Sequence, residues 1–266
     1  MCDYTSPFRK VSRAGCGTGF RLAADSSPRG SRRRCYDAFV PTVPRGKFIT
    51  FEGLDGSGKS TQLEKLAAVL RAERMPVLVS REPGGTQTGE KIRQLLLDRG
   101  GSAVVPLAEL ALMFASRAQH LSQVIQPALG QGKIVLCDRF TDSSEAYQGG
   151  GRQLGSAVVL RLHGMLCEGF EPDLTILMDS DVDSSVDRAR RRNRSRVAAR
   201  NDESRFEQEN RAFFERVRDA YLAIARREPQ RVVIVDARGS PDETHRQIVE
   251  VVRHKLKLKA LERSSV

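Results

Sequence analysis

The segment that most constrains the fold of this chain is a glycine-rich run at residues 53–60, Gly-Leu-Asp-Gly-Ser-Gly-Lys-Ser. It fits the pattern G-x-x-x-x-G-K-[ST], in which a tight turn joins a strand to the first turn of a helix. The flanking sequence agrees, because residues 48–51 form an apolar, β-prone run and residues 61–70 carry apolar side chains at helical spacing. Such a turn directs backbone N–H groups and the positive end of a helix at a polyphosphate. The chain is therefore expected to bind a nucleoside triphosphate.

Individual residues of this phosphate loop (residues 53–60) have distinct expected roles. Lys59 is placed to hold the β- and γ-phosphates, and the hydroxyl of Ser60 is placed to ligate Mg²⁺. Asp138 ends the apolar run at residues 133–138 with a carboxylate that can orient Mg²⁺ or its waters. The residues expected to bind the triphosphate are Gly53, Leu54, Asp55, Gly56, Ser57, Gly58, Lys59, Ser60 and Thr61.

From residue 46 onward, short apolar runs alternate with longer helical patterns. Strands are predicted at residues 47–52, 76–80, 133–138, 174–179 and 231–236. Helices are predicted at residues 59–73, 88–97, 107–130, 155–168, 183–192, 204–227 and 241–261. This alternation is typical of an α/β protein whose parallel sheet, here five-stranded, has helices on both faces. In such folds ligands bind at the carboxyl ends of the strands, where the phosphate loop, Arg81 and Asp138 fall.

Residues 1–45 differ in composition from the rest of the chain. They hold nine Lys or Arg residues and three Asp, so they carry more than half of the net charge of +11. Because the segment is rich in Ser, Gly and Arg and has little apolar periodicity, we predict a disordered basic leader followed by one domain at residues 46–266. An organelle transit peptide and a translation start assigned too far upstream are alternatives. A secretory signal is not, because the segment lacks the continuous apolar region that such a signal needs.

The composition favours a reducing, aqueous compartment. The five cysteines show no C-x-x-C pairing, and an odd number at scattered spacing argues against a disulfide framework or a zinc site. No apolar run approaches the roughly 18 residues of a membrane-spanning helix. We therefore expect a cytoplasmic protein with no membrane partner. Because the positive charge is local, it does not by itself predict specific nucleic-acid binding.

Arginine residues accompany the predicted strand ends. Arg139 follows Asp138 directly, and its planar guanidinium suits bidentate binding of phosphate oxygens. Arg81 precedes a Glu-Pro-Gly-Gly-Thr turn, where backbone can approach a ligand closely. Arg117 lies in a predicted helix. Taken singly, Arg81 could belong to an ordinary turn and Arg117 to a solvated helix face.

Taken together and in order, these segments resemble the bacterial thymidylate kinases, a family of nucleoside-monophosphate kinases. The resemblance extends from about residue 46 to the last predicted helix and leaves out residues 1–45. The phosphate loop is common to many families, whereas the turn at residues 81–86 and the run at residues 147–152 are specific to this one. The matching stretches are residues 51–61, 81–86, 113–120, 138–152 and 204–209.

The resemblance implies a P-loop NTPase fold and transfer of the ATP γ-phosphate to dTMP, with Mg²⁺, giving dTDP and ADP in dTTP biosynthesis. It implies that Arg81, Arg117 and Arg139 hold the 5′-phosphate of dTMP, with Arg139 bridging to the donor. Asp55 is expected to contact the 3′-hydroxyl. The family also suggests a homodimer packed through helices.

The same resemblance implies a pocket for the base and sugar. Ser144, Tyr147 and Gln148 are expected to line it, with Phe114 or Met113 stacking nearby. A tyrosine ring near the 2′ position of the sugar is a plausible steric filter against ribonucleotides. The side-chain amide of Gln148 can pair with the polar edge of a pyrimidine.

The arginine cluster at about residues 188–205 resembles the lid of the family, which closes over the donor and excludes water. Some relatives carry an arginine inside the phosphate loop. This chain has none there, so the lid must supply the missing cation. Arg192 is the expected catalytic residue of the lid, beside Lys59 and Arg139. The segment is longer than usual for the family, and a solvated helix face or a nucleic-acid patch is the alternative interpretation.

Two other functions remain open from the sequence. A deoxynucleoside kinase also has a phosphate loop and an arginine after the third strand, but it needs a carboxylate base near its acceptor hydroxyl. A nucleic-acid-associated nucleotide switch could use the basic leader, although no Asn-Lys-x-Asp guanine motif occurs. Comparing thymidine with dTMP as acceptor, and deleting residues 1–45, separates these possibilities.

Overall fold

The computed structural model of the chain describes residues 44–98, 104–197, 206 and 209–256, and of residues 192–197 the backbone alone. The predicted leader lies outside this part, except for its last two residues. Arg45 already belongs to the folded domain, because its guanidinium lies 2.9 Å from a carboxylate oxygen of Asp173. The next residue, Gly46, donates its N–H to the carbonyl of Leu129 at 2.8 Å.

The domain is built on a five-stranded parallel sheet with the strand order β2-β3-β1-β4-β5. The strands are β1 (Phe48–Glu52), β2 (Val77–Arg81), β3 (Ile134–Asp138), β4 (Leu174–Asp179) and β5 (Val232–Asp236). The predicted fold class is confirmed, and the strand limits differ from the prediction by at most one residue at either end. Phe51 in the central strand pairs with Asp138, so the strand ends that carry the polar residues lie side by side.

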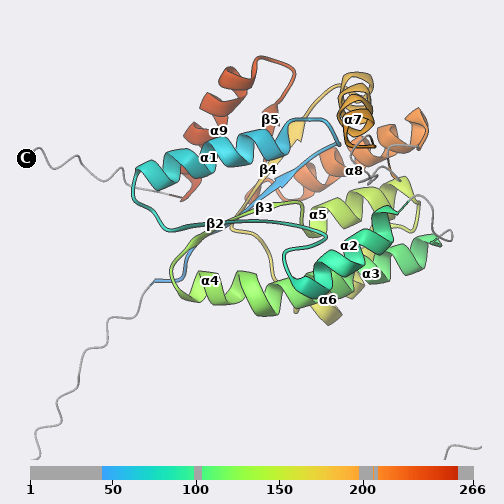
Figure 1. Cartoon of the computed structure of the whole chain (residues 1–266), viewed down its shortest axis with the longest axis horizontal. Helices are drawn as coiled ribbons and strands as arrows, with labels where there is room; N and C mark the ends of the chain where they lie inside the picture. Colours follow the sequence, from blue (N-terminus) through green and yellow to red (C-terminus); the bar gives the residue numbers. More distant parts are fainter. Residues whose placement is uncertain (1–43, 99–103, 198–205, 207–208, 257–266) are drawn as a thin grey trace, which may run out of the picture. The chain divides into compact units, whose positions relative to one another are not determined.

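Helices cover both faces of the sheet (Figure 1). On one face, α1 (Lys59–Ala72) and α9 (Pro241–Leu256) pack on alternate strand residues such as Ile49 and Phe51. The other face carries α3 (Pro106–His120), α4 (Gln126–Gly130) and α6 (Ser156–Leu166). There Phe48, from the same strand, is buried among their apolar side chains. The alternation of β1 side chains between two apolar cores is the pattern of a central parallel strand.

The predicted helix at residues 107–130 is one helical run with an irregular turn. Between α3 and α4 lies a π-helical segment, η1 (Leu121–Ile125), in which the N–H of Gln126 donates to the carbonyl of Leu121. Pro127 follows at once and has no N–H to donate, so a regular hydrogen bond is lost at this point. The wider turn lets the helix continue past the proline.

Two elements were not predicted from the sequence. They are the short helix α5 (Thr141–Ser144) and the π-helical segment η2 (Glu145–Gly151), which follow β3 and Arg139. Four of the residues in η2 have little helical propensity, since three are glycine and one is tyrosine. Packing on α8 (Arg211–Arg227) compensates, because an added Cβ at Gly150 would lie 2.7 Å from the Cβ of Ala220.

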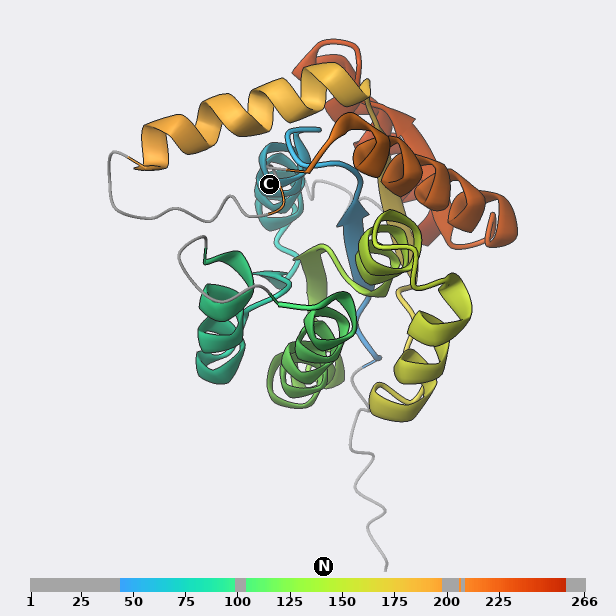
Figure 2. The same cartoon turned by 90° about the vertical axis from the view of Figure 1, so that its right-hand side faces the viewer.

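Three further helices complete the described part of the domain. α2 (Gln87–Leu97) follows β2, and α7 (Val182–Val197) follows β4 and extends away from the sheet (Figure 2). α8 begins at Arg211 rather than at residue 204, because the side chain of Asn210 caps it by accepting the N–H of Phe213 at 2.9 Å. Residues 198–205 of the predicted lid lie outside the described residues.

Candidate functional site

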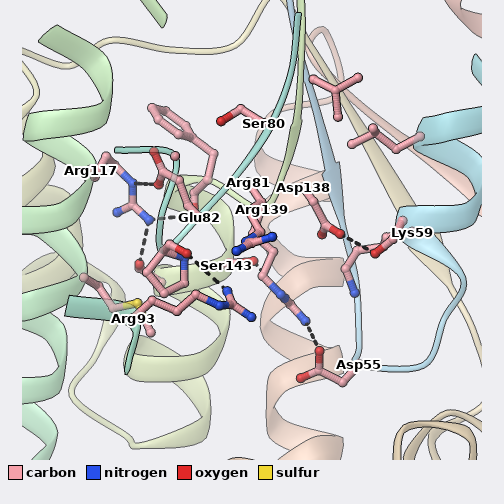
Figure 3. Close-up of a pocket in the computed structure, with 18 of the residues that line it drawn as sticks. Asp55, Lys59, Ser80, Arg81, Glu82, Arg93, Arg117, Asp138, Arg139 and Ser143 are labelled. Atoms are coloured by element: carbon pink, nitrogen blue, oxygen red, sulfur yellow. Dashed lines mark hydrogen bonds and ion pairs between the residues drawn. The ribbon is translucent and has the colours of Figure 1, made fainter. Parts of the chain in front are cut away.

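A large cavity lies at the carboxyl ends of β1, β2 and β3 (Figure 3). Its volume is about 1010 Å³, at the upper limit of the roughly 300–1,000 Å³ that single-ligand pockets usually have. The lining includes the phosphate loop, the turn after β2, Arg139 after β3, and residues from α3 and η2. Segments far apart in the sequence therefore meet where the sequence predicted a ligand site.

The phosphate loop needs its glycines. Gly58 caps α1 with a left-handed φ of 95°, which places the first N–H groups of that helix at the cavity. Gly56 has a φ of 81°, and a Cβ there would lie 2.1 Å from the carbonyl oxygen of Ser185. Any side chain at Gly56 would have to displace the start of α7.

Lys59 is buried, and its ammonium is held inside the loop. Its Nζ donates to the carbonyls of Gly53 at 3.1 Å and Leu54 at 2.7 Å. Burial lowers the pKa of Lys59 to about 8, and the charge on Arg139 adds to that effect. The ammonium thus lies at the opening of the loop, where an anionic ligand would stabilise its positive charge.

Ser60 and Asp138 meet as the metal hypothesis requires. The hydroxyl of Ser60 donates to Oδ2 of Asp138 at 2.6 Å, while Oδ1 of Asp138 is buried without a hydrogen-bond partner. One hydroxyl, one carboxylate and the phosphates of a substrate are a usual ligand set for Mg²⁺. Within the described ranges no group of three or more His, Cys, Asp or Glu residues could hold a metal by itself. The residues present therefore fit a cation shared with a phosphate ligand.

Arg139 is the most heavily constrained cation of the cavity. Its Nη2 donates to Asp55 at 2.8 Å and to the Tyr147 hydroxyl at 3.2 Å. Its Nη1 donates to the carbonyl of Gly53 at 3.2 Å, and the guanidinium lies 4.8 Å from the centroid of the Tyr147 ring. The backbone of Arg139 has a φ of 71°, which is uncommon for a residue with a side chain. The strand end thus turns this arginine back over the phosphate loop.

Arg117 lies at the other end of the cavity from Lys59 in Figure 3. It is almost fully buried, and its Nε donates to Glu82 at 2.7 Å. Its Nη2 donates to the hydroxyl of Ser144 at 3.0 Å, whereas Nη1 is buried with no hydrogen-bond partner. Since buried donors are normally paired, Nη1 is available to a ligand.

A chain of hydrogen bonds supports Glu82 from behind. His120 lies with its Nδ1 2.9 Å from Oε1 of Glu82, and the hydroxyl of Ser80 lies 2.6 Å from its Nε2. Because a carboxylate only accepts, Nδ1 of His120 donates to Glu82. The sequence motifs pointed to Arg117 but not to this support.

Arg81 and Arg93 complete the cationic lining. Arg81 is half-exposed and pairs with Glu90 at 2.9 Å. Arg93, in α2, donates to the carbonyl of Pro83 at 3.1 Å. Sequence reasoning missed Arg93. Its position two helical turns after the Pro-Gly-Gly turn was the available signal, because such a residue returns to the same side of the helix.

The structure corrects one expected ligand contact. Phe114 is fully buried in the core against the guanidinium of Arg117, 4.7 Å from its ring centroid, and does not line the cavity. Met113 does line it, together with Ser144, Tyr147 and Gln148. One residue along a helix turns the side chain by about 100°, so Met113 can face the cavity while Phe114 is directed into the core.

The lid hypothesis falls largely outside the described residues. The side chain of Arg192 is not described. Arg188, Arg190 and Arg191 are described, and none of these three lines the cavity. Arg190 donates instead to the carbonyl of Glu209 at 3.4 Å. The assignment of Arg192 as a catalytic residue stays a prediction.

Parallel sheet, phosphate loop and cation-lined cavity together define a P-loop nucleotide-binding protein. The family model for thymidylate kinase matches residues 51–248. The chain is 49% identical over 209 residues to a thymidylate kinase of Trichlorobacter lovleyi, which covers 79% of this chain and 98% of the relative. It is 45% identical over 211 residues to one of Geobacter sulfurreducens, with 79% and 98% covered.

A solved structure gives the same result. The thymidylate kinase of Ehrlichia chaffeensis matches with a TM-score of 0.63 and 32% identity, covering 79% of this chain and 100% of that one. The chain belongs to the thymidylate kinase family.

Proposed function

We propose that this chain transfers the γ-phosphate of ATP to the 5′-phosphate of dTMP, giving dTDP and ADP. The observation that carries the proposal is the meeting of Lys59 and Arg139 at one cavity, with the arginines of β2, α2 and α3 along its wall. Two phosphate groups that approach each other need such a concentration of cations, because phosphoryl transfer depends on positioning and charge neutralisation.

The donor is assigned to the phosphate loop. The N–H groups at the start of α1 face its phosphates, and Lys59 exchanges the carbonyls of Gly53 and Leu54 for phosphate oxygens. Mg²⁺, held by Ser60 and Asp138, neutralises charge on the phosphate oxygens when it is bound. The unpaired Oδ1 of Asp138 supports this assignment.

The acceptor phosphate is assigned to Arg139 and Arg81. The carboxylate of Asp55 now accepts a hydrogen bond from Nη2 of Arg139. When dTMP binds, its 3′-hydroxyl would donate to that carboxylate instead. Arg139 is then released toward the two phosphates, where its fork can bridge them. Arg81 reaches the same end of the cavity from β2 once it leaves Glu90.

The base and sugar are assigned to the far end of the cavity. Ser144, Tyr147, Gln148 and Met113 line the cavity, and the Ser144 hydroxyl contacts Arg117. In Figure 3 Arg117 lies away from Lys59. We therefore assign its unpaired Nη1 to the base, whereas the family resemblance implied the phosphate of dTMP. Gln148 donates to Glu109 at 2.8 Å, which leaves its carbonyl oxygen to accept from a pyrimidine N–H.

The test is ADP release, in a coupled assay, across dTMP, dUMP, dCMP, dGMP and thymidine. dTMP is the expected best acceptor, and thymidine is expected to be inert because the arginines suit a phosphate that is already present. Turnover on thymidine but not on dTMP would establish a deoxynucleoside kinase instead. Turnover on dTMP should stop on chelation of Mg²⁺ with EDTA and return on adding the metal back.

We also propose that two copies of the chain associate through α3 and α6. These helices are in contact and carry exposed apolar side chains, among them Leu107 (58% exposed), Met165 (77%) and Leu166 (46%). Exposed apolar side chains on two helices that contact each other are a candidate interaction surface. Sedimentation equilibrium should give a dimer for the wild type and a monomer for Met165→Glu, and a monomeric wild type would refute the proposal.

None of the helices in the described ranges combines the length and apolarity that a membrane crossing requires. Cytoplasmic localisation therefore stays a proposal, as does the assignment of residues 1–45 to a leader. Specific nucleic-acid binding is not expected. Salt-sensitive DNA binding that is lost on deleting residues 1–45 would contradict that expectation.

A further inference from the structure

Next to Arg139 lies a cluster of three oxygen atoms, two of which belong to residues that do not line the ligand cavity. The hydroxyl of Ser143 donates to Oε2 of Glu52 at 2.5 Å, and the hydroxyl of Tyr221 donates to the same oxygen at 3.0 Å. The two hydroxyl oxygens are 2.8 Å apart. Nη1 of Arg139 donates to both, at 2.9 Å to Ser143 and 3.2 Å to Tyr221.

Two members of this cluster lie outside the lining of the cavity. Glu52 is fully buried and Tyr221 is 3% exposed, and in the described part of the chain neither lines the cavity, whereas Ser143 does. Burial, with the charge of Asp142, raises the pKa of Glu52 to about 7. Burying an ionisable group that touches no ligand is costly, so a positioning role is the natural use for it.

Glu52 fixes Arg139 from two directions. Its Oε2 accepts hydrogen bonds from the two hydroxyls that in turn accept from Nη1 of Arg139. Its Oε1 accepts the backbone N–H of Phe140, the residue after Arg139, at 2.7 Å. That second contact stabilises the peptide next to the left-handed backbone of Arg139. One buried carboxyl therefore anchors both the main chain and the guanidinium of this arginine.

Tyr221 brings α8 into the arrangement. It approaches Arg139 opposite Tyr147, with the two ring centroids 6.4 Å apart at an interplanar angle of 79°. α8 is anchored to the end of β4 by Arg218, whose guanidinium donates to both oxygens of Asp179 at 2.7 and 2.8 Å. The Tyr221 hydroxyl is held by a helix rather than by a loop, and that helix also packs through its buried side chains Phe214, Val217 and Ile224.

We propose that Tyr221, oriented by Glu52, is a positioning residue that sets the direction of the Arg139 guanidinium for phosphoryl transfer. Tyr221 acts through Arg139 and touches neither nucleotide. The inference rests on the proposed function, since it assumes that Arg139 acts on the phosphates. A positioning role differs from a role in binding, because loss of the Tyr221 hydroxyl should slow the chemical step with little change in substrate affinity.

Tyr221→Phe tests it by removing one hydroxyl and keeping the ring. We expect kcat on dTMP to fall about tenfold to hundredfold, because small displacements of a catalytic group cost that much, while KM for dTMP and ATP stays within about twofold. Glu52→Gln, which keeps the shape of the side chain, should have the same kind of effect. Circular dichroism and Tm establish that each variant is folded.

Arg218→Gln is the matched control on the same helix. It removes the ion pair to Asp179 but leaves the contacts of Arg139 in place, so it should lower Tm and leave kcat nearly unchanged. A loss of kcat in Arg218→Gln as large as in Tyr221→Phe would assign the effect to general loosening of α8 and overturn the proposal.

A double-mutant cycle gives the decisive readout. In an Arg139→Ala background, Tyr221→Phe should produce no further loss of kcat, because its route to the phosphates is gone. Losses that multiply, or a Tyr221→Phe enzyme with normal kcat, would overturn the inference. Inactivity of the wild type on dTMP would instead refute the proposed function, so the two failures are distinguishable.

Discussion

The two ends of the cavity are built differently. At the phosphate end, one contiguous stretch at residues 53–60 supplies the N–H groups, Lys59 and Ser60, and the ends of β2 and β3 add Arg81, Asp138 and Arg139. At the base end, Arg117 is held by Glu82 from another element and supported in turn by His120. The phosphate loop depends mainly on backbone geometry, whereas the base end depends on a buried network of side chains. Charge changes should therefore alter catalysis at one end and stability together with binding at the other.

The largest effect is expected at the phosphate end. Arg139→Ala should lower kcat by about 100- to 1,000-fold, the usual loss for one preorganised group that stabilises transition-state charge. Steady-state ADP release is the measurement. Arg238→Ala, which removes an exposed arginine paired with Asp236, is the control and should be fully active. Near-normal turnover of Arg139→Ala would contradict the catalytic role assigned to the phosphate end.

At the base end, Glu82→Gln should act on stability first. Arg117 and Glu82 are 2% and 3% exposed, and removing one partner of a buried pair costs about 3–5 kcal/mol of unfolding free energy. KM for dTMP should rise while KM for ATP does not.

Urea unfolding and acceptor kinetics measure both effects. The control is Glu90→Gln, which breaks the exposed pair with Arg81 in the same turn and should cost less than about 1 kcal/mol. Equal losses in the two variants would show that burial of the Glu82 pair has no special role.

The pH dependence sharpens the account of Lys59. Burial lowers its pKa to about 8, so the ammonium is present below that pH and lost above it. In the ligand-free enzyme, kcat/KM for ATP should then fall about tenfold per pH unit on the basic side of pH 8. Lys59→Arg should remove this basic limb whatever its activity. A wild-type profile that is flat up to the ordinary lysine pKa of about 10.4 would contradict the assignment.

The smallest effect is expected at the apolar wall of the base end. Met113→Ala should raise KM for dTMP by about tenfold or less, because it removes a few methylene-sized contacts. Phe114→Leu should lower Tm without changing that KM, since Phe114 is buried away from the cavity. The reverse pattern would show that the base contacts Phe114.

What could be predicted from the sequence follows the same division. The five strands and the phosphate loop were predictable because local hydrophobic periodicity and glycine spacing dictate them. Asp138 and Arg139 were predictable because a strand end fixes where they lie. These features depend on residues that are neighbours in the chain.

The base end could be predicted only in part, because it depends on packing between distant elements. The segment η2 has a sequence poor in helix formers and is helical only against α8. The choice of Met113 over Phe114 depends on the rotation of α3, which the periodicity of an apolar helix leaves ambiguous. Glu82, His120 and Tyr221 carry no motif that would have assigned them to a buried network.

A crystal structure with dTMP and a non-hydrolysable ATP analogue tests the central claim most directly. The account predicts that Arg139 leaves Asp55, now 2.8 Å away, and that its guanidinium bridges the two nucleotides while Nη1 keeps the Tyr221 hydroxyl within hydrogen-bond distance. An Arg139 that remains paired with Asp55, with its guanidinium contacting neither phosphate, would contradict it.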